Sequence, residues 1–336
     1  MSSESGQPGE RIAKVIARAG LASRREAEAW IAAGRVSVNG SAITSPARNV
    51  TAADAVAVDG KPLPVRERTR LFLHHKPRGR VTSHADPGGR PTVFAALPKG
   101  LPRLISVGRL DLDTEGLLLL TNDGGLARAL ELPATGWLRR YRVRARGRVE
   151  QAALDRLRRG VTIDGMRYGP IEATVDRVQG GNVWLTVAIR EGKNREVKNV
   201  LGHLGLAVNR LIRVSFGPFR LGELPPGAIE EVRTRALRDQ LGERLAALAG
   251  ADFAGPRIER AAAATASEAP RQARPNGRGE PAREGRPPRH RGRQGGAEPQ
   301  QAAAKRKPRD SERIGEPERA RREKRRRRRS ARRPLR

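Results

Sequence analysis

Residues 11–63 show the apolar pattern of a small module that begins with a helix. Ile12, Val15, Ile16 and Ala19 follow the i, i+3, i+4, i+7 spacing of a helix that buries one face. The charged residues between them lie on the other side of such a helix. We therefore expect a first amphipathic helix with an apolar buried face and a basic exposed face.

A second helix and a small sheet are expected to follow. The run Ser23-Arg24-Arg25-Glu26 is a capping box, which predicts a helix start, and Gly34 is typical of a helix end. Val36-Ser37-Val38 and Ala55-Val56-Ala57-Val58 alternate as short strands do, and Asn39-Gly40 favours a tight hairpin. The module is thus predicted to consist of two helices packed on a small antiparallel sheet.

The segment from 70 to 240 mixes strand-like and helix-like patterns and is long enough to bury a full core. The predicted elements are a strand at 183–189, helices at 151–159 and 194–203, and hairpin turns at Asp164-Gly165 and Gly180-Gly181-Asn182. Their order is not a regular strand–helix repeat. This favours the α+β class with an antiparallel or mixed sheet.

Apolar periodicity stops near residue 250, where Ala, Gly, Pro, Arg and Gln begin to dominate. Residues 251–336 contain 27 Lys and Arg against 11 Asp and Glu, a net charge of +16. Such a segment cannot bury enough apolar surface to offset its chain entropy. We expect a disordered, Arg-rich tail that attracts RNA without sequence preference; the alternative is a solvated tail that only aids solubility.

Charge and composition narrow the possible functions. The 336 residues include 68 Lys and Arg but 36 Asp and Glu, a net charge of +32, so the expected partner is a polyanion, with nucleic acid the first candidate. The chain has no cysteine, which excludes thiol catalysis, disulfides and cysteine-ligated metal sites. The first residues are polar and the longest leucine run is Leu117–Leu120, so we expect no signal peptide, no membrane span and a cytoplasmic protein.

An acidic segment separates two apolar runs near the middle of the chain. Asp111, Asp113, Glu115 and Gly116 match the first half of a calcium-binding loop, but Asn122 stands where that loop requires a bidentate carboxylate. A calcium site is therefore not favoured. For Asp113 and Glu115 the preferred interpretation is that they shape a turn.

Asp111 differs because it follows Gly108-Arg109-Leu110 and precedes an apolar strand, at the expected mouth of the core. An ionised carboxylate there needs a positive partner. Residues 191–198 and 139–143 are rich in cations, and Tyr141 adds an aromatic ring. A carboxylate, a cation and an aromatic ring in a basic protein describe a site for one nucleobase, with stacking on the ring and a carboxylate at the sugar.

Residues 11 to about 60 resemble a known RNA-binding module. The runs Ala22-Ser23-Arg24-Arg25-Glu26-Ala27 and Gly34-Arg35-Val36-Ser37-Val38-Asn39-Gly40 are similar to those of the alpha-L module, which also occurs in a ribosomal protein of the small subunit. The resemblance implies RNA binding through the helix pair. The contacts it implies are Lys14, Arg24, Arg25 and Arg35.

Four further motifs occur in the order typical of rRNA pseudouridine synthases: Lys76-Pro77-Arg78-Gly79, Gly108-Arg109-Leu110-Asp111-Leu112-Asp113-Thr114-Glu115-Gly116, Tyr141, and Glu191-Gly192-Lys193-Asn194-Arg195-Glu196-Val197-Lys198. More narrowly, the chain resembles the subfamily that carries an alpha-L module and modifies a uridine of large-subunit rRNA. Many members end the last motif with Arg. This chain has Lys198, which preserves the charge but not a bidentate geometry.

The resemblance implies an α+β protein in three parts: an alpha-L type module at 11–63, a pseudouridine synthase domain with a mixed or antiparallel sheet at 70–240, and a disordered basic tail at 251–336. The partner would be large-subunit rRNA or its assembly intermediate, bound by a monomer. Because the isomerisation balances atoms and oxidation state, no metal and no cofactor are expected. The alternative is a non-catalytic rRNA-binding factor of ribosome assembly.

The same resemblance assigns roles to residues. Asp111 would be the essential carboxylate, either as a nucleophile at the anomeric carbon or as a base that removes a sugar proton. Lys198 would stabilise its charge, and Arg109 would help hold the flipped nucleotide or the loop. Tyr141 would pack against the uracil ring; the alternative is that it is a core aromatic. The basic loop from Lys76 to Arg90 would clamp the RNA strand through Lys76 and Arg78, and His84 is expected to be a surface residue rather than a catalyst.

Overall fold

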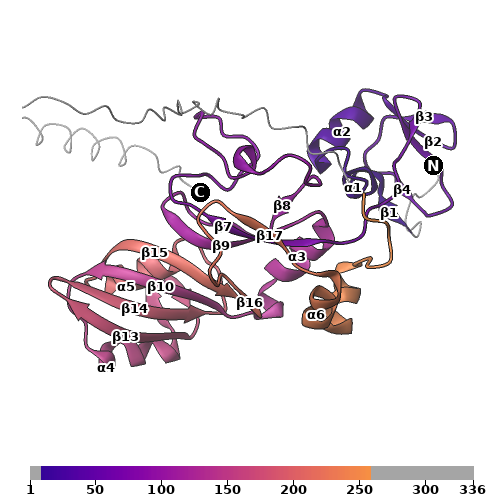
Figure 1. Ribbon diagram of the computed structural model, residues 1–336. Coiled ribbons are helices and arrows are strands. Elements are labelled where there is room, and N and C mark those ends of the chain that lie inside the picture. Colours follow the sequence, from indigo (N-terminus) through magenta and orange to yellow (C-terminus); the bar gives the residue numbers. More distant parts are fainter. Residues whose placement is uncertain (1–8, 259–336) are drawn as a thin grey trace, which may run out of the picture. The chain divides into compact units, whose positions relative to one another are not determined.

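The computed structural model describes residues 9–258, which form an N-terminal module and a larger domain built around one sheet (Figure 1). The predicted tail lies outside the described residues from residue 259 onward.

The N-terminal module combines two helices with short antiparallel strands. Its elements are β1 (Glu10–Arg11), α1 (Ile12–Arg18), α2 (Arg24–Ala32), β2 (Val36–Val38), β3 (Ser41–Ile43), β4 (Asn49–Val50), β5 (Val56–Val58) and β6 (Lys61–Pro62). The strands pair in the order β3-β2-β5-β6, and β1 pairs with β4. Ser23 and Glu26 form the predicted capping box at the start of α2. Ile12 and Ile16 of α1 pack in one core with Ile31 of α2 and Val36 of β2, which confirms the predicted architecture.

The larger domain is organised by a nine-stranded sheet in which β13-β14-β10-β15-β9-β7-β17 are neighbours, β16 pairs with β15 and β8 with β9. The strands are β7 (Leu71–Lys76), β8 (Ile105–Ser106), β9 (Thr114–Thr121), β10 (Arg139–Arg146), β13 (Ile171–Gln179), β14 (Asn182–Ile189), β15 (Ala207–Phe216), β16 (Phe219–Arg220) and β17 (Ile229–Glu231). The β9–β15 pair is parallel and the other pairs are antiparallel, so the sheet is mixed, as predicted. A separate hairpin joins β11 (Val161–Ile163) to β12 (Met166–Tyr168).

Helices and short 3₁₀ turns complete the domain. They are α3 (Gly124–Glu131), α4 (Gln151–Asp155), α5 (Glu196–His203) and α6 (Thr234–Ala249), with 3₁₀ turns at Phe94–Ala96, Pro133–Thr135 and Arg156–Arg159. In the part of the chain that the structure describes, no helix is long and apolar enough to cross a membrane.

The predicted elements of this domain are largely confirmed. Both glycine-containing turns join hairpin strands, and the apolar run at 183–189 is a strand. The helix expected at 151–159 changes to a 3₁₀ turn halfway. The helix expected from residue 194 begins only at Glu196, because Arg195 adopts a left-handed conformation with φ 51° that a helix cannot include.

Strand β9 lies in the middle of the sheet and is buried on both faces. Leu117 and Leu119 pack in a cluster with residues of α3 and α6, whereas Leu118 and Leu120 pack with residues of the segment 93–110. This two-sided burial explains the uninterrupted leucine run. The same packing holds the chain directly after the acidic segment 111–116 and so fixes where that segment lies.

Strand β10 is covered on only one face. Val143 and Ala145 pack with residues of α4, α5 and the neighbouring strands. The alternating arginines of β10 point to the opposite face and are exposed or partly exposed. This part of the sheet therefore has one apolar, helix-covered face and one basic face.

The folded domain extends further than expected at its C-terminal end. Residues 251–258 fall in the predicted tail, yet they run along the start of β7: Thr69 donates its N–H to Asp252 at 2.6 Å and Arg68 donates to Pro256 at 3.1 Å. Ala251 and Phe253 pack against the cluster that contains α3 and α6. These two apolar side chains explain why the segment is held in place.

Candidate active site

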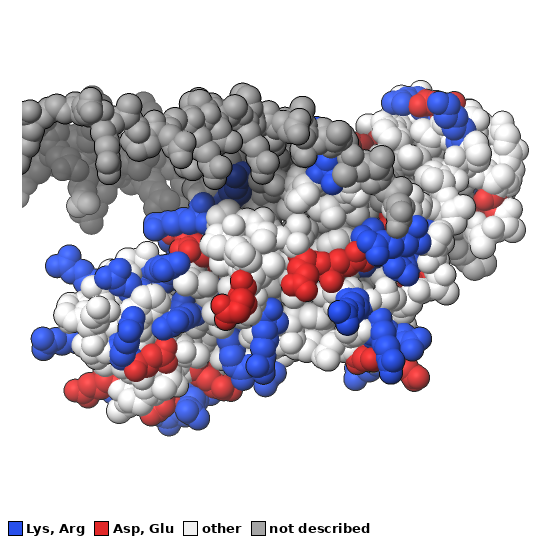
Figure 2. All heavy atoms as spheres, in the orientation of Figure 1, with Lys and Arg blue, Asp and Glu red and all other residues white. Residues whose placement is uncertain are grey.

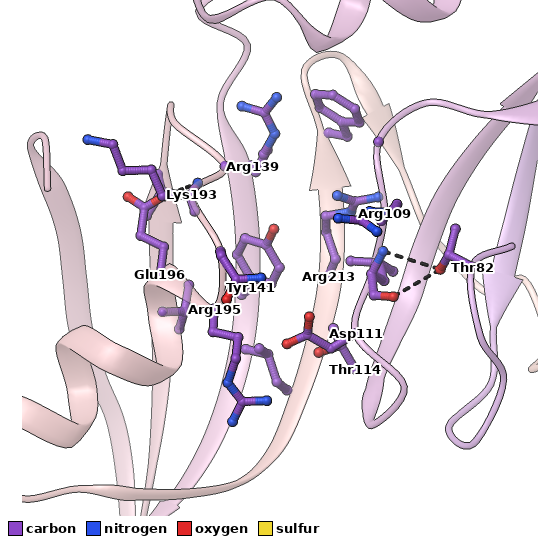
Figure 3. A pocket seen from close by; sticks show the side chains of 18 of the residues that line it. Thr82, Arg109, Asp111, Thr114, Arg139, Tyr141, Lys193, Arg195, Glu196 and Arg213 are labelled. Atoms are coloured by element: carbon purple, nitrogen blue, oxygen red, sulfur yellow. Dashed lines mark hydrogen bonds between the residues drawn. The ribbon is translucent and has the colours of Figure 1, made fainter. Parts of the chain in front are cut away.

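A cleft of about 900 Å³ opens between the segment 106–114, strands β10 and β15, and the loop from β14 to α5 (Figure 3). Its lining includes Arg109, Asp111 and Tyr141, three of the residues that the sequence singles out. It is the size of a typical small-ligand pocket, which suits one extruded nucleotide.

Asp111 projects into the cleft from the loop between β8 and β9. Gly108, at φ 68°, lets the chain turn before Leu110, whose side chain enters the core. A second turn follows at once, in which Thr114 donates its N–H to the Asp111 carbonyl at 3.1 Å. The Asp111 side chain retains 32% of its exposure, so its carboxylate reaches the cleft and not the interior.

Thr82 fixes the backbone directly before Asp111. Its hydroxyl donates to the Leu110 carbonyl at 2.9 Å and accepts the Leu110 N–H at 3.3 Å (Figure 3). Glu131 of α3 accepts the N–H of Gly108 at 2.5 Å. Thr82 and Glu131 were not found from the sequence, because nothing near either one marks it as a partner of a segment far along the chain.

Lys198 of α5 contacts two carboxylates. Its Nζ lies 3.4 Å from Oδ2 of Asp111 and donates a hydrogen bond to Asp113. The predicted pairing with Asp111 is therefore confirmed, but Asp113 is the closer partner. The interpretation that Asp113 only shapes a turn is wrong, because that carboxylate binds the ammonium that faces Asp111. Glu115 likewise has a partner, since it forms two hydrogen bonds with Arg210, at 3.1 and 3.0 Å.

The ion pair shifts the titration of Asp113. Burial raises the pKa of this carboxyl, but the hydrogen bond and the charge of Lys198 outweigh burial and hold the pKa below its ordinary value, with a smaller contribution from Arg195. Asp113 is therefore ionised at neutral pH and keeps the Lys198 ammonium in place beside Asp111.

Lys76 does not have the position expected of an RNA contact. Its side chain is fully buried, and its Nζ donates to the carbonyls of Thr114, Pro77 and Leu112 at 2.9, 3.1 and 3.3 Å. The prediction that Lys76 clamps RNA is wrong: Lys76 ties strand β7 to the loop that carries Asp111. Arg78, two residues further, is exposed, as an RNA contact requires.

Tyr141 and Arg109 meet the cleft in different ways. Tyr141 of β10 is 7% exposed and faces the same opening as Asp111 (Figure 3). Its ring rests in the core beside Leu211, so it forms a fixed wall. Arg109 is exposed at the rim and has no hydrogen bond or ion pair within residues 9–258, which leaves its guanidinium available to a ligand.

Three buried charged residues of the cleft wall were not singled out from the sequence. Arg139 donates to the carbonyls of Arg190 and Glu191 at 2.6 and 3.0 Å and so holds the start of the loop to α5. Glu196 accepts the Lys193 N–H at 3.0 Å, and burial raises its pKa. Arg213 donates from Nε to the Leu117 carbonyl at 2.7 Å, while its Nη2 has no partner within the described chain. All three lie in basic or acidic runs whose burial depends on tertiary packing.

The predicted RNA contacts of the N-terminal module differ in their surroundings. Lys14 pairs with Glu10, and Arg35 pairs with Asp59 and lies over the Trp30 ring at 5.0 Å. The guanidinium groups of Arg24 and Arg25 are exposed and have no partner in residues 9–258. His84 is exposed and stacks on Phe94, in keeping with a surface position.

Comparisons with known proteins show which families the chain is similar to. Residues 10–56 match the S4 domain family, and residues 70–203 match the RNA pseudouridylate synthase family. An RNA pseudouridine synthase of Rickettsia prowazekii, described as uncharacterized, is 43% identical over 231 residues, 69% of this chain and 97% of that protein. The ribosomal large subunit pseudouridine synthase B of Pseudomonas aeruginosa is 42% identical over 255 residues, 72% of this chain and 65% of that protein. The corresponding synthase B of Haemophilus influenzae is 42% identical over 238 residues, 68% of this chain and 67% of that protein.

The two matching families, one an RNA-binding domain and the other an RNA-modifying enzyme, place the protein among the enzymes that modify RNA. The chain belongs to the RNA pseudouridine synthase family and carries an N-terminal S4 domain.

Proposed function

We propose that this protein converts a specific uridine of large-subunit rRNA to pseudouridine, with Asp111 as the essential carboxylate. The observation that carries the proposal is the cleft in which Asp111 faces Tyr141 and lies 3.4 Å from Lys198. The relatives named synthase B act, by their names, on the large ribosomal subunit, which supports rRNA as the substrate. We expect the enzyme to act as a monomer in the cytoplasm.

The reaction breaks the bond between N1 of uracil and C1′ of the ribose and forms a bond between C5 and C1′. The base turns within the cleft between these events, the proton leaves C5, and N1 gains a proton. Asp111 acts either as the nucleophile at C1′ or as the base that removes a sugar proton, and both roles require the carboxylate form. The Lys198 ammonium, held by Asp113, offsets the charge of that carboxylate.

The uridine must leave its stack before it reaches Asp111, at a cost of a few kcal/mol. Tyr141 supplies a fixed aromatic wall against which the extruded uracil packs. Arg109 stands free at the rim, where it contacts the backbone of the flipped nucleotide or replaces the base in the stack. Arg24, Arg25 and Arg78, also exposed, bind the surrounding RNA.

Asp111→Asn tests the catalytic assignment. We expect this variant to bind rRNA with unchanged affinity and to form no pseudouridine, because the amide can neither attack C1′ nor accept a proton. The measurement is pseudouridine mapping in rRNA from a deletion strain that expresses the wild type, the variant, or the control Asp239→Asn on the exposed face of α6. Pseudouridine formation by Asp111→Asn at the rate of the control would refute the role of Asp111.

Substitution of Lys198 tests the ion pair. Lys198→Ala is expected to lower kcat on the order of 100-fold with little change in affinity, because Asp111 and Asp113 lose their shared cation. Lys198→Arg retains the charge and should recover most of the rate. Equal rates for the wild type and Lys198→Ala would contradict this role.

The alternative is a factor of ribosome assembly that binds rRNA but does not modify it. The intact set of Asp111, Tyr141 and Lys198 favours the enzyme. The same experiment separates the two: a deletion strain with unchanged pseudouridines but defective large subunits, rescued by Asp111→Asn, would favour the assembly factor.

A further inference from the structure

The geometry points to a second RNA-binding surface on the open face of strands β13, β14, β10 and β15, opposite α4 and α5. This inference depends on the proposed function in one respect: the RNA that binds this surface is the substrate rRNA. This basic sheet face consists of Arg140, Arg142, Arg144, Arg146, Arg177, Trp184 and Arg210. In Figure 2, Lys and Arg side chains are scattered over the part of the molecule that contains these strands, with Asp and Glu side chains among them.

The residues of the basic sheet face form two lines. Along β10, alternate residues point to one side, so the four arginines from 140 to 146 follow one another at intervals of about 6.7 Å. Across the sheet, the strand register aligns Arg177, Trp184, Arg144 and Arg210 on β13, β14, β10 and β15. Neighbouring strands are about 4.8 Å apart, so the second line crosses the first at Arg144.

Most of these cations have no carboxylate partner. The side chains of Arg140, Arg144 and Arg146 form no hydrogen bond, ion pair or ring contact within residues 9–258. Only Arg210 is neutralised, by Glu115. Two other carboxylates lie on the same face: Asp176, which accepts a hydrogen bond from Thr186, and Glu172.

Trp184 lies within this surface and is itself prepared for a polar ligand. The guanidinium groups of Arg142 and Arg177 lie 4.9 and 5.5 Å from its ring centroid, so the ring holds two arginines in position. Its Nε1 is buried and has no acceptor within the described chain.

The repulsion among the cations of the basic sheet face lowers the stability of the folded protein. Like charges on adjacent positions of one sheet face repel, and the arginines at 140, 142, 144 and 146 follow one another along β10. A polyanion that places phosphates on this surface relieves the repulsion and releases counterions. The chemistry therefore fits the phosphate backbone of an RNA segment other than the one that enters the cleft, because Tyr141 and Val143 of the same strand face the opposite side.

The test compares two triple variants of the full chain. Arg140→Gln, Arg144→Gln and Arg146→Gln remove three unpaired cations of the basic sheet face. The matched control, Arg156→Gln, Arg158→Gln and Arg159→Gln, removes three exposed cations from the segment that follows α4. Thermal unfolding of both variants checks that they fold.

The measurements are the Kd for a large-subunit rRNA transcript, its salt dependence, and pseudouridine formation at saturating RNA. For the first triple variant we expect a Kd raised about tenfold, a salt slope reduced by about 2 for three lost phosphate contacts, and an unchanged kcat. The control should change Kd less than twofold. Equal Kd values for both triple variants, or for the first variant and the wild type, would overturn the inference. Because Kd is measured in the Asp111→Asn background, where no turnover occurs, this result is independent of whether Asp111 is catalytic.

Discussion

Lys76 carries a charge inside the protein, where it holds the loop that contains Asp111. Its ammonium donates to three backbone carbonyls, two of which belong to residues 112 and 114 beside Asp111. Burial lowers the pKa of Lys76 to about 8, and the nearby charges of Asp113 and Asp111 only partly offset this effect. At neutral pH Lys76 is thus protonated, although burial disfavours its charge. The three hydrogen bonds that this ammonium donates hold the loop in place.

This pKa predicts a dependence of stability on pH. Between about pH 8 and 10.5 the unfolded chain keeps a proton on Lys76 that the folded protein has lost, so the free energy of unfolding rises with pH over this window. The contribution is most favourable above pH 10.5 and is lost as pH falls through 8; a shift of this size corresponds to roughly 3 kcal/mol. Urea unfolding of the wild type and of Lys76→Met across this range measures it as the difference between the two curves. If the free energies of unfolding of the two proteins changed equally with pH, the lowered pKa of Lys76 would be contradicted.

At the scale of elements, the site depends on the parallel contact between β9 and β15. Gly116 adopts φ 102°, and a Cβ on it would meet the backbone of Arg213, with the amide nitrogen at 2.7 Å. The two strands approach this closely only because residue 116 has no side chain. The contact sets where β9 begins and hence where the preceding Asp111 loop lies.

Gly116→Ala is therefore expected to destabilise the protein by about 3 kcal/mol or more and to reduce pseudouridine formation. The control is Gly181→Ala, at a hairpin position where a Cβ meets nothing within 4 Å. Denaturant midpoints and turnover of the folded fraction measure both effects. If the two variants had equal stability, the close approach of β9 and β15 would not be required.

At the scale of the whole molecule, the proposed function involves both the described residues 9–258 and the basic segment 259–336. Residues 251–258 pack on the larger domain and contain one Asp and one Arg, so residues 259–336 keep the net charge of +16. Half of the total net charge of +32 thus lies in residues 259–336. We expect this segment to bind RNA electrostatically and not to take part in the chemistry.

Truncation after residue 258 should weaken non-specific RNA binding and flatten its salt dependence, while kcat at saturating RNA stays unchanged. The comparison is between full-length and truncated protein over a salt series. Truncation after residue 250 is a useful second variant, because it removes the packed segment and should also lower stability. Equal salt slopes with and without residues 259–336 would exclude the electrostatic role.

Much of this organisation is encoded locally and was predictable. The capping box at Ser23, the hairpin turns at Asp164-Gly165 and Gly180-Gly181, and the apolar run of β14 each depend on residues within a few positions of one another. The position of Asp111 in the cleft was also predictable, because a carboxylate between a turn and a buried strand lies at the mouth of the core, where it needs a positive partner. Local backbone preference and side-chain alternation carry this information.

Tertiary structure decided which charged residues are inside and what each one contacts. Lys76 precedes Pro-Arg-Gly and so resembles a surface residue, yet the pairing of β7 with β9 buries it under the loop that contains Asp111. The contact between Asp113 and Lys198 depends on the packing of α5 beside the loop that contains Asp113. The alternation of arginines in β10 is visible in the sequence, but the packing of α4 and α5 determines which face stays open. Burial and long-range contact arise from how distant segments pack, and no local pattern specifies them.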